Sequence, residues 1–263
     1  VALEGDFVDA KIGDVNGDGV PELVVVMNLT KFGDKSTPHV FIATYDWDGT
    51  HFSEIPSASL DIGKENKSLR CNNFQLLDQD ADGEQEIVLS LGSPFRGFAI
   101  VNSSPTGLSI VKKIRPDQLL VGSGLLYVAA LDYDFDGYDD VVAFSPDGSI
   151  VKAQPFYNIG GVFDSGHLVK KEVEGLSGIL THSLELTDWD SDGFSDVLVS
   201  FNSGDIIAFT LTPATLVIDL LPITSGPLTQ VCVADFNQDT YKDVLTLSSE
   251  INALTLISGK DGG

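Results

Sequence analysis

Five short acidic loops recur along the 263-residue chain, and an apolar run follows each loop directly. The loops span residues 14–22 (loop 1), 78–86 (loop 2), 132–140 (loop 3), 188–196 (loop 4) and 235–243 (loop 5). If loop positions are counted from 1 to 9, a side chain with an oxygen atom occupies positions 1, 3, 5 and 9 of every loop. These residues are Asp14, Asn16, Asp18 and Glu22; Asp78, Asp80, Asp82 and Glu86; Asp132, Asp134, Asp136 and Asp140; Asp188, Asp190, Asp192 and Asp196; and Asp235, Asn237, Asp239 and Asp243. A local structure that returns five times predicts a repeat architecture.

The ligand pattern of these loops indicates a metal. Several carboxylates that converge from one tight turn are what hard cations, calcium in particular, prefer. The loops are not EF-hands, because position 12 lacks the bidentate glutamate of that motif and is apolar or Thr246 instead. The runs that follow, such as Leu23–Val26 and Val141–Phe144, are typical of buried strands. We therefore predict four to five calcium ions, each held in a turn between two strands.

The repeat length predicts the fold. The loops return every ~50–60 residues, the range of propeller blades rather than of short solenoid units. In the first repeat we expect strands at Phe7–Gly13, Leu23–Met27, His39–Trp47 and His51–Ile55, with an Asp48-Gly49 hairpin turn between the last two. No convincing amphipathic helix is visible. The sequence therefore predicts an all-β chain, a β-propeller of four-stranded antiparallel blades.

Residues 1–263 are expected to form a single propeller domain. Its repeats are expected at about 1–56, 57–115, 116–174, 175–222 and 223–263. The last repeat stops after its third strand. Two interpretations follow: a closed ring of five blades completed by a very short N-terminal strand, or part of a larger ring. We favour the larger ring.

The loop resembles the Asp-x-Asp-x-Asp-Gly-x-x-Asp signature of FG-GAP/VCBS-type repeats. Such repeats build the calcium-binding propeller of integrin alpha subunits and of many secreted adhesion proteins and lectins, where seven blades are common. The resemblance implies calcium ligation by the side chains of positions 1, 3, 5 and 9. It also implies a backbone carbonyl ligand from position 7, which is Val20, Glu84, Tyr138, Phe194 and Tyr241. Loop 5 departs from the pattern with Asn237 and with Thr240 in place of glycine, so we expect it to be the weakest site.

The resemblance implies a non-enzymatic interaction or adhesion module, extracellular or on a cell surface, with secretory or periplasmic compartments as further possibilities. Basic residues gather in the segments 28–38 and 57–68, which we expect on the face opposite the metal loops. We predict that a protein partner binds there, through Lys31, Lys35, Lys64, Lys67 and Arg70. The alternative interpretation is that these are lysines of solvated loops.

A carbohydrate-binding lectin, or the binding domain of a larger carbohydrate-active enzyme, is the second function class. Aromatic residues in loops 3 and 4 bear on this choice: Tyr133, Phe135, Tyr138, Trp189 and Phe194. They either pack between blades or form a sugar-stacking platform. The other loops differ between repeats in length and content, which favours a protein partner over repeated sugar sites.

Composition excludes several classes. The formal net charge is −24, whereas a nucleic-acid-binding protein requires a basic surface, so nucleic acid is not an expected partner. Nearly half of the 39 acidic residues are the loop ligands. No apolar run approaches the ~18 residues of a membrane span. Outside the loops we find no nucleophile, metal-ligand or phosphate-binding constellation, so we predict no enzymatic activity.

Two further sequence features concern the surface and the core. Glycosylation acceptor patterns begin at Asn28, Asn66 and Asn102 and would suit a secreted surface. Cys71 and Cys232 fall at different heights in predicted first strands, and a disulfide within one ring is therefore not expected. Both are predicted to be small buried hydrophobes.

Overall fold

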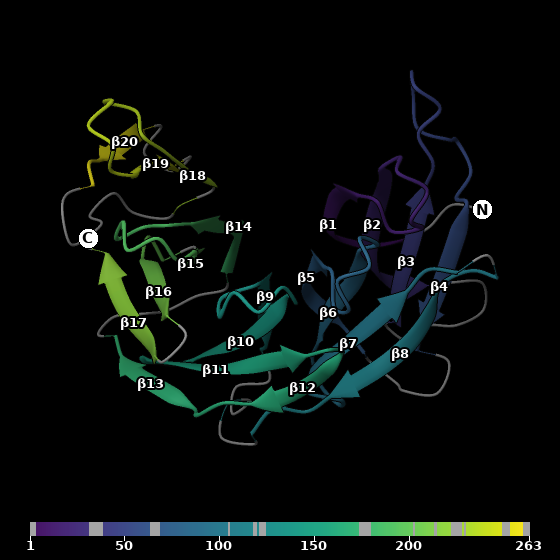
Figure 1. The fold of residues 1–263 in the computed structure, drawn as a ribbon, viewed down its shortest axis with the longest axis horizontal. Coiled ribbons are helices and arrows are strands. Elements are labelled where there is room, and N and C mark those ends of the chain that lie inside the picture. The colour runs from purple at the N-terminus through teal and green to yellow at the C-terminus, as the bar shows by residue number, and fades with distance from the viewer. Residues whose placement is uncertain are drawn as a thin grey trace. The chain divides into compact units, whose positions relative to one another are not determined.

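The structure of the chain is a computed structural model that describes residues 4–31, 39–63, 69–104, 106–117, 120, 125–173, 180–201, 203–212, 215–221, 228, 230–248 and 253–259. In these residues the chain forms twenty strands and no helix (Figure 1). The strands form five sheets with antiparallel pairing. Each sheet is one blade of a β-propeller, which confirms the predicted fold class.

The strands follow chain order within the blades. Blade 1 contains β1 (Glu4–Gly13), β2 (Glu22–Lys31), β3 (His39–Tyr45) and β4 (Ala58–Ile62). Blade 2 contains β5 (Cys71–Leu77), β6 (Glu86–Leu91), β7 (Gly97–Asn102) and β8 (Ser109–Ile114). Blade 3 contains β9 (Tyr127–Leu131), β10 (Asp140–Asp147) and β11 (Ile150–Ile159), and both β12 (Val162–Ser165) and β13 (Val169–Glu172) pair with β11. Blade 4 contains β14 (Leu180–Thr187), β15 (Asp196–Phe201), β16 (Ile206–Thr212) and β17 (Thr215–Leu221), and blade 5 contains β18 (Gln230–Ala234), β19 (Asp243–Ser248) and β20 (Ala253–Ile257).

The contacts divide the chain into two compact units. The first comprises residues 1–132, 136–145 and 154–166, and the second comprises residues 133–135, 146–153 and 167–263. Blades 1 and 2 lie in the first unit and blades 4 and 5 in the second, while blade 3 contributes to both.

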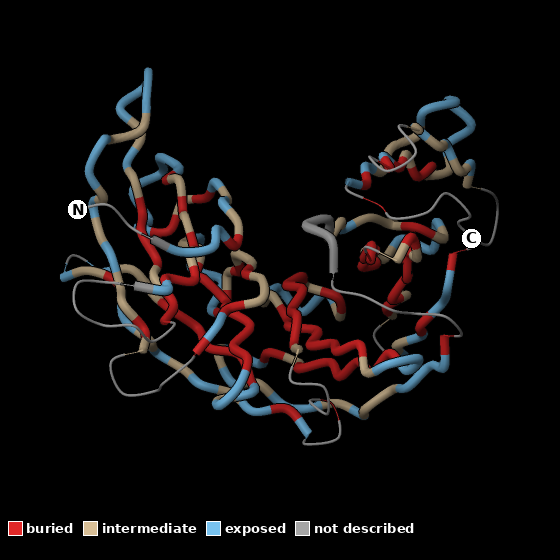
Figure 2. Tube along the Cα trace, turned by 180° about the vertical axis from the view of Figure 1, so that it is seen from behind, coloured by how far each residue is buried: buried red, intermediate tan, exposed pale blue. Residues whose placement is uncertain are grey.

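The inner strands of the blades carry the core. Every residue of β6 and of β15 is buried, as the continuous apolar runs of the sequence predict for strands covered on both faces (Figure 2). In the first unit, Val24, Ile42 and Phe74 belong to one buried cluster. In the second unit, Leu198 and Ile206 belong to another. The outermost strands are more exposed; in β8, exposed and half-buried residues alternate.

The fourth strand of blade 1 differs from the prediction. It is β4 (Ala58–Ile62), and not His51–Ile55. The Asp48 carboxylate accepts the N–H groups of Thr50 and His51, which closes a local turn beyond the end of β3. Beyond this turn only an isolated bridge joins Trp47 to Phe52, and the strand pairing with β3 resumes near Ser57, whose N–H donates to the Thr44 carbonyl at 2.8 Å. The first blade therefore extends to residue 62, beyond the approximate boundary at residue 56 that the sequence suggested.

The structure also revises two surface assignments. The Asn28 side chain is buried, and its amide exchanges two 2.8 Å hydrogen bonds with the backbone of Cys71. The Asn28 side chain is therefore not accessible as a glycosylation acceptor, while Asn66 lies outside the described residues. Cys71 is buried and free as predicted. Cys232 is free but exposed, because blade 5 leaves one face of β18 accessible, so its predicted burial is wrong.

Candidate metal centres

Each acidic loop joins the first strand of its blade to the second, as predicted, so loops 1 to 5 follow β1, β5, β9, β14 and β18. All five loops share one backbone conformation. Position 4 is left-handed in every loop, with φ of 72°, 58°, 60°, 62° and 65° at Gly17, Ala81, Phe135, Ser191 and Gln238. Position 6 is left-handed too, with φ of 81°, 89°, 93°, 91° and 81° at Gly19, Gly83, Gly137, Gly193 and Thr240. Glycine adopts this region without cost, which explains its presence at position 6 of four loops.

Two hydrogen bonds recur in all five loops and orient the predicted ligands. The N–H of position 6 donates to the carboxylate of position 1 at 2.8–3.2 Å. The N–H of position 7 donates to the carboxylate of position 5 at 2.8–2.9 Å. The backbone thus fixes the acidic side chains before any ligand binds. Ligation by the position-7 carbonyls stays a prediction.

The carboxylate of position 9 starts the second strand and is buried in every loop. The exposed fraction is 2% for Glu22 and Glu86 and 0% for Asp140, Asp196 and Asp243. In loops 1, 2, 4 and 5 this carboxylate accepts the N–H of position 2 at 2.9–3.0 Å. Burial raises the pKa of Glu86 to about 7 and that of Asp196 to about 6, and the neighbouring aspartates contribute less to the rise. A nearby cation would remove the cost of charging these groups.

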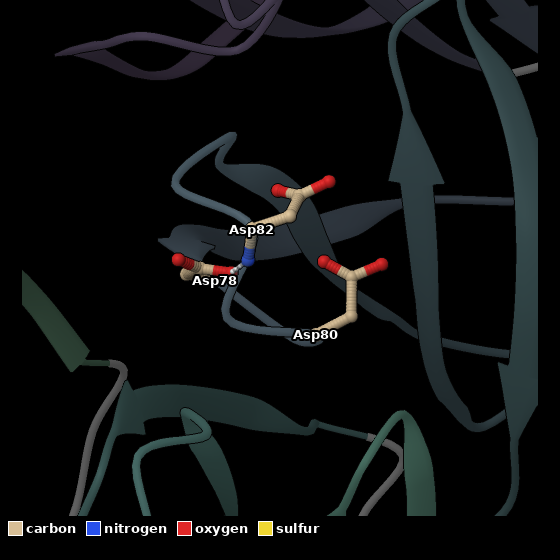
Figure 3. A group of neighbouring side chains, drawn as sticks. All are labelled: Asp78, Asp80 and Asp82. Atoms are coloured by element: carbon tan, nitrogen blue, oxygen red, sulfur yellow. Dashed lines mark hydrogen bonds between the residues drawn. The ribbon is translucent and has the colours of Figure 1, made fainter.

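Loops 2, 3 and 4 each bring three carboxylates together. Oxygen atoms of three acidic residues lie within 4.8 Å of one another in each loop, namely Asp78, Asp80 and Asp82; Asp132, Asp134 and Asp136; and Asp188, Asp190 and Asp196. Figure 3 shows the group in loop 2, where the Asp82 N–H donates to the Asp78 carboxylate at 3.2 Å.

Two of these three groups also contain a buried oxygen atom without a hydrogen-bond partner, which a cation could satisfy. In loops 3 and 4 the buried Oδ1 atoms of Asp132 and Asp188 have no hydrogen-bond partner. A buried, unpaired carboxylate oxygen is costly unless a cation satisfies it. The donor chemistry and these two oxygens therefore fit a calcium-like ion, which positions 1, 3, 5 and 9 would hold.

Loops 1 and 5 form no such three-carboxylate group among the described residues, and both carry asparagine at position 3. In loop 1 the Asn16 amide donates to Glu22 at 3.0 Å, and in loop 5 the Asn237 amide donates to Asp239 at 2.9 Å. The amide therefore satisfies carboxylate oxygens that a cation would otherwise bind.

Most of the aromatic side chains in loops 3 and 4 pack against the protein, which favours the interpretation that they pack between blades over a sugar-stacking platform. The position-2 side chains Tyr133 and Trp189 are 1% and 7% exposed. Phe135 of loop 3 contacts Phe194 of loop 4, with ring centroids 5.0 Å apart, so this pair joins neighbouring blades. Phe135 is nevertheless 59% exposed. Tyr138 is half-buried.

The structure places two of the five residues predicted to bind a protein partner. Lys31 is the last residue of β2, and Arg70 is exposed and pairs with Asp6 at 3.2 Å. Lys35, Lys64 and Lys67 lie outside the described residues. Asn28–Lys31 and Ala58–Ile62 belong to strands, so both predicted loops are shorter than the segments 28–38 and 57–68. Residues 28–31 were predicted as loop because the second strand was predicted to end at Met27, and residues 58–62 because the fourth strand was placed too early.

Sequence reasoning missed an open groove in the first unit. It has a volume of about 650 Å³ and lies beside loop 1, between segments of blades 1 and 2. Its polar lining includes Glu22, Asp46, Glu84, Asn102, Ser103 and Ser104. No sequence motif marks it, because separate segments of two blades contribute these residues. The described part of the chain contains no helix that is long and apolar enough to cross a lipid bilayer.

Comparison with known proteins supports the fold alone. No protein-family model matches the chain, and no curated protein matches its sequence. Among solved structures, the rhamnogalacturonan lyase YesW aligns with a TM-score of 0.63 and 16% identity, over 98% of this chain and 50% of the lyase chain. The chain thus spans about half the length of that lyase. BBS1N, crystallised in complex with ARL6DN, aligns with a TM-score of 0.41 and 11% identity over 98% of this chain and 93% of its own.

Proposed function

We propose that this chain is a calcium-stabilised β-propeller of the FG-GAP/VCBS type that serves as a binding module and catalyses no reaction itself. The observation that carries the proposal is the fivefold loop geometry, in which loops 2, 3 and 4 gather three carboxylates within 4.8 Å. The buried, unpaired oxygens of Asp132 and Asp188 support it. A bound calcium ion would supply positive charge that offsets these carboxylates.

The location of the perturbed carboxylates supports a non-enzymatic role. The carboxylates with a raised pKa include Glu22, Asp80, Glu86, Asp139, Asp190 and Asp196, and these six lie in loops 1 to 4. Such groups often mark active sites. Here, acid–base work by the position-3 and position-9 members would compete with metal binding.

Equilibrium dialysis against calcium tests the metal proposal directly. We expect at least three bound ions per chain, and fewer for each loop whose position-5 aspartate is replaced by alanine. Position 5 suits this test because its side chain is exposed in every loop. A chain that stays folded and binds no calcium at millimolar concentration would refute the proposal.

For the binding role, we propose an extracellular or cell-surface protein partner that contacts the face opposite the metal loops. The support is the concentration of Lys31, Lys35, Lys64, Lys67 and Arg70 in one part of an acidic chain, which would steer an acidic partner. The double variant Lys64→Glu/Lys67→Glu should slow association more than it speeds dissociation, as expected for rim charges. The matched control is Lys170→Glu/Lys171→Glu in blade 3. If the Lys64→Glu/Lys67→Glu variant associates with its partner at the same rate as the parent chain, the partner does not bind at this face.

The groove of blades 1 and 2 favours carbohydrate binding as a second candidate. Hydroxyl, amide and carboxylate groups dominate its polar lining, and its volume of about 650 Å³ lies within the ~300–1,000 Å³ of small-molecule sites. A glycan array is the test, with Ser103→Ala/Ser104→Ala to open the lining. Binding of a neutral glycan that this variant weakens would support the candidate, and an array without binding would reject it.

A further inference from the structure

We infer that loops 2 and 3 bind metal as a coupled pair, and that Asp139, which is not a predicted ligand, is the positioning residue that couples them. The inference rests on the proposed calcium binding of the loops. All the contacts that carry it lie within the first compact unit.

Asp139 occupies position 8 of loop 3 and contacts position 1 of loop 2 twice. Its Oδ2 atom accepts the N–H of Asp78 at 2.8 Å, and its own N–H donates to the Asp78 carbonyl at 3.1 Å. Both backbone groups of the first ligand residue of loop 2 are therefore held by loop 3.

The same carboxylate also reaches the start of its own loop. The backbone N–H groups of Asp78 and Asp132 both donate hydrogen bonds to the Asp139 carboxylate. Asp78 and Asp132 are the position-1 residues of loops 2 and 3. A single half-buried carboxylate thus joins the first ligand residues of two loops.

Asn158 makes a second connection between the same loops. Its side chain is fully buried, and its Nδ2 atom donates to the carbonyl of Gln79 at 2.6 Å and to that of Asp139 at 3.0 Å. Its backbone N–H donates to Oδ1 of Asp140, the position-9 carboxylate of loop 3, at 2.6 Å. Position 2 of loop 2 is therefore tied to positions 8 and 9 of loop 3.

Fewer hydrogen bonds connect loops 1 and 2 in this way than connect loops 2 and 3. The Gln85 N–H, from position 8 of loop 2, donates to the Asp14 carbonyl at 2.8 Å. The Gln85 amide oxygen is a possible acceptor, but among the hydrogen bonds of the described residues none joins it to the Asp14 N–H. The reciprocal contact is thus a property of Asp139, and the backbone contact alone is shared by both loop pairs.

These contacts couple the sites because buried hydrogen-bond networks have few alternative arrangements. A metal ion that orders Asp78 in loop 2 would also fix Asp139 and, through it, Asp132 in loop 3. The second ion would then meet a loop that is already ordered. Coupling between sites typically changes affinity by about 5–150-fold, and it is reciprocal.

The experiment uses the full chain with calcium as the probe. Asp18→Ala, Asp192→Ala and Asp239→Ala remove the exposed position-5 ligands of loops 1, 4 and 5 and leave loops 2 and 3 intact. Adding Asp136→Ala or Asp82→Ala leaves one loop alone. Calorimetric titration should show that each loop alone binds at least fivefold more weakly than in the two-loop protein, by the same factor for both loops.

Asp139→Ala in the two-loop protein should abolish this difference, and Asp139→Asn, which keeps an oxygen acceptor, should reduce it. Ser195→Ala, at position 8 of loop 4, is the matched control and should change nothing. Melting curves confirm folding of each variant. A purely structural role would lower the melting temperature and leave the affinity ratio intact, which would overturn the inference. Loss of all calcium binding in the parent chain would instead refute the proposed function.

Discussion

Loops 2, 3 and 4 and loops 1 and 5 share a backbone conformation, and position 3 is the ligand position that distinguishes the two groups. In the first group position 3 is aspartate and three carboxylates lie within 4.8 Å. In the second group position 3 is asparagine, and its amide donates to the neighbouring carboxylate of Glu22 or Asp239. One oxygen-for-nitrogen exchange thus separates loops whose three carboxylates could hold a cation from loops in which an amide satisfies a carboxylate.

The comparison separates two roles of the same motif. The turn geometry depends on backbone N–H groups that cap positions 1 and 5, and these bonds recur in all five loops. Affinity for metal depends on how many carboxylates converge. Loops 1 and 5 therefore keep the blade architecture, and we expect loops 2, 3 and 4 to dominate calcium binding.

Removal of calcium should have the largest effect. Chelation should lower the melting temperature of the parent chain by several degrees or more, because each site filled at 100 times its Kd adds about 2.7 kcal/mol. The triple variant Asp82→Ala/Asp136→Ala/Asp192→Ala should lose most of this shift. The double variant Asp18→Ala/Asp239→Ala should keep most of it. If chelation lowers the melting temperature of the two variants equally, measured by calorimetry, loops 2, 3 and 4 do not dominate calcium binding.

The pH dependence of the metal-free chain should come next. Burial raises the pKa of Glu86 to about 7 and that of Asp196 to about 6, above the ~4.3 and ~3.9 of unfolded chains. Carboxylates with a raised pKa favour the folded state at low pH, and this contribution is lost as pH rises through 6 and 7. The chelated chain should therefore melt at a higher temperature at pH 5 than at pH 8.

Calcium should reverse that trend, because it requires the deprotonated carboxylates. Glu86→Gln/Asp196→Asn should flatten the pH profile of the chelated chain, while Asp48→Asn, at an exposed turn outside the loops, should not. A chelated chain that is most stable at pH 8 would contradict the assignment of these carboxylates.

Restoring the carboxylate at position 3 should sharpen the comparison further. Asn16→Asp and Asn237→Asp should each strengthen calcium binding at their own loop on the order of tenfold, or about 1.4 kcal/mol. Asp80→Asn in loop 2 should weaken binding there to a similar extent. Site-resolved titration in the single-loop backgrounds measures both. If Asn237→Asp does not strengthen calcium binding at loop 5, the position-3 amide does not explain the difference in affinity between the two groups of loops.

The parts of the molecule that depend on local pattern were predictable. The five loops, the buried strands after them and the propeller class follow from recurrence and from runs such as Val197–Val199, because both signals are local in sequence. The prediction that loop 5 binds calcium most weakly follows from Asn237 and Thr240 in the sequence and stays a prediction. The structure indicates that loop 1 belongs with loop 5, because the Asn16 amide donates to the buried carboxylate of Glu22. The sequence could not show this contact, since it depends on how the loop folds back.

The parts that depend on pairing over distance were not predictable. The Asp48-Gly49 turn correctly predicts a reversal but does not reveal that β4 pairs only from Ala58 onward. The contact between Asp139 and Asp78 joins residues 61 positions apart, and a position-8 aspartate looks like any exposed loop acid in the sequence. The exposure of Cys232 likewise depends on which face of β18 a neighbour covers.

The smallest predicted effect concerns the strain in loop 5. Thr240 holds φ at 81°, in the left-handed region that glycine occupies at position 6 of the other loops. A β-branched residue pays a steric cost there, which exceeds what glycine loses through its greater freedom in the unfolded chain. Thr240→Gly should therefore stabilise the chelated chain by about 1 kcal/mol, measured by denaturant unfolding.

The reverse change in loop 4, Gly193→Thr, should destabilise it by a similar amount, since its φ is 91° and nothing lies within 4 Å of the added Cβ atom. Strain rather than a clash would then be the cause in both loops, and a neutral Thr240→Gly would show that loop 5 relaxes its backbone instead.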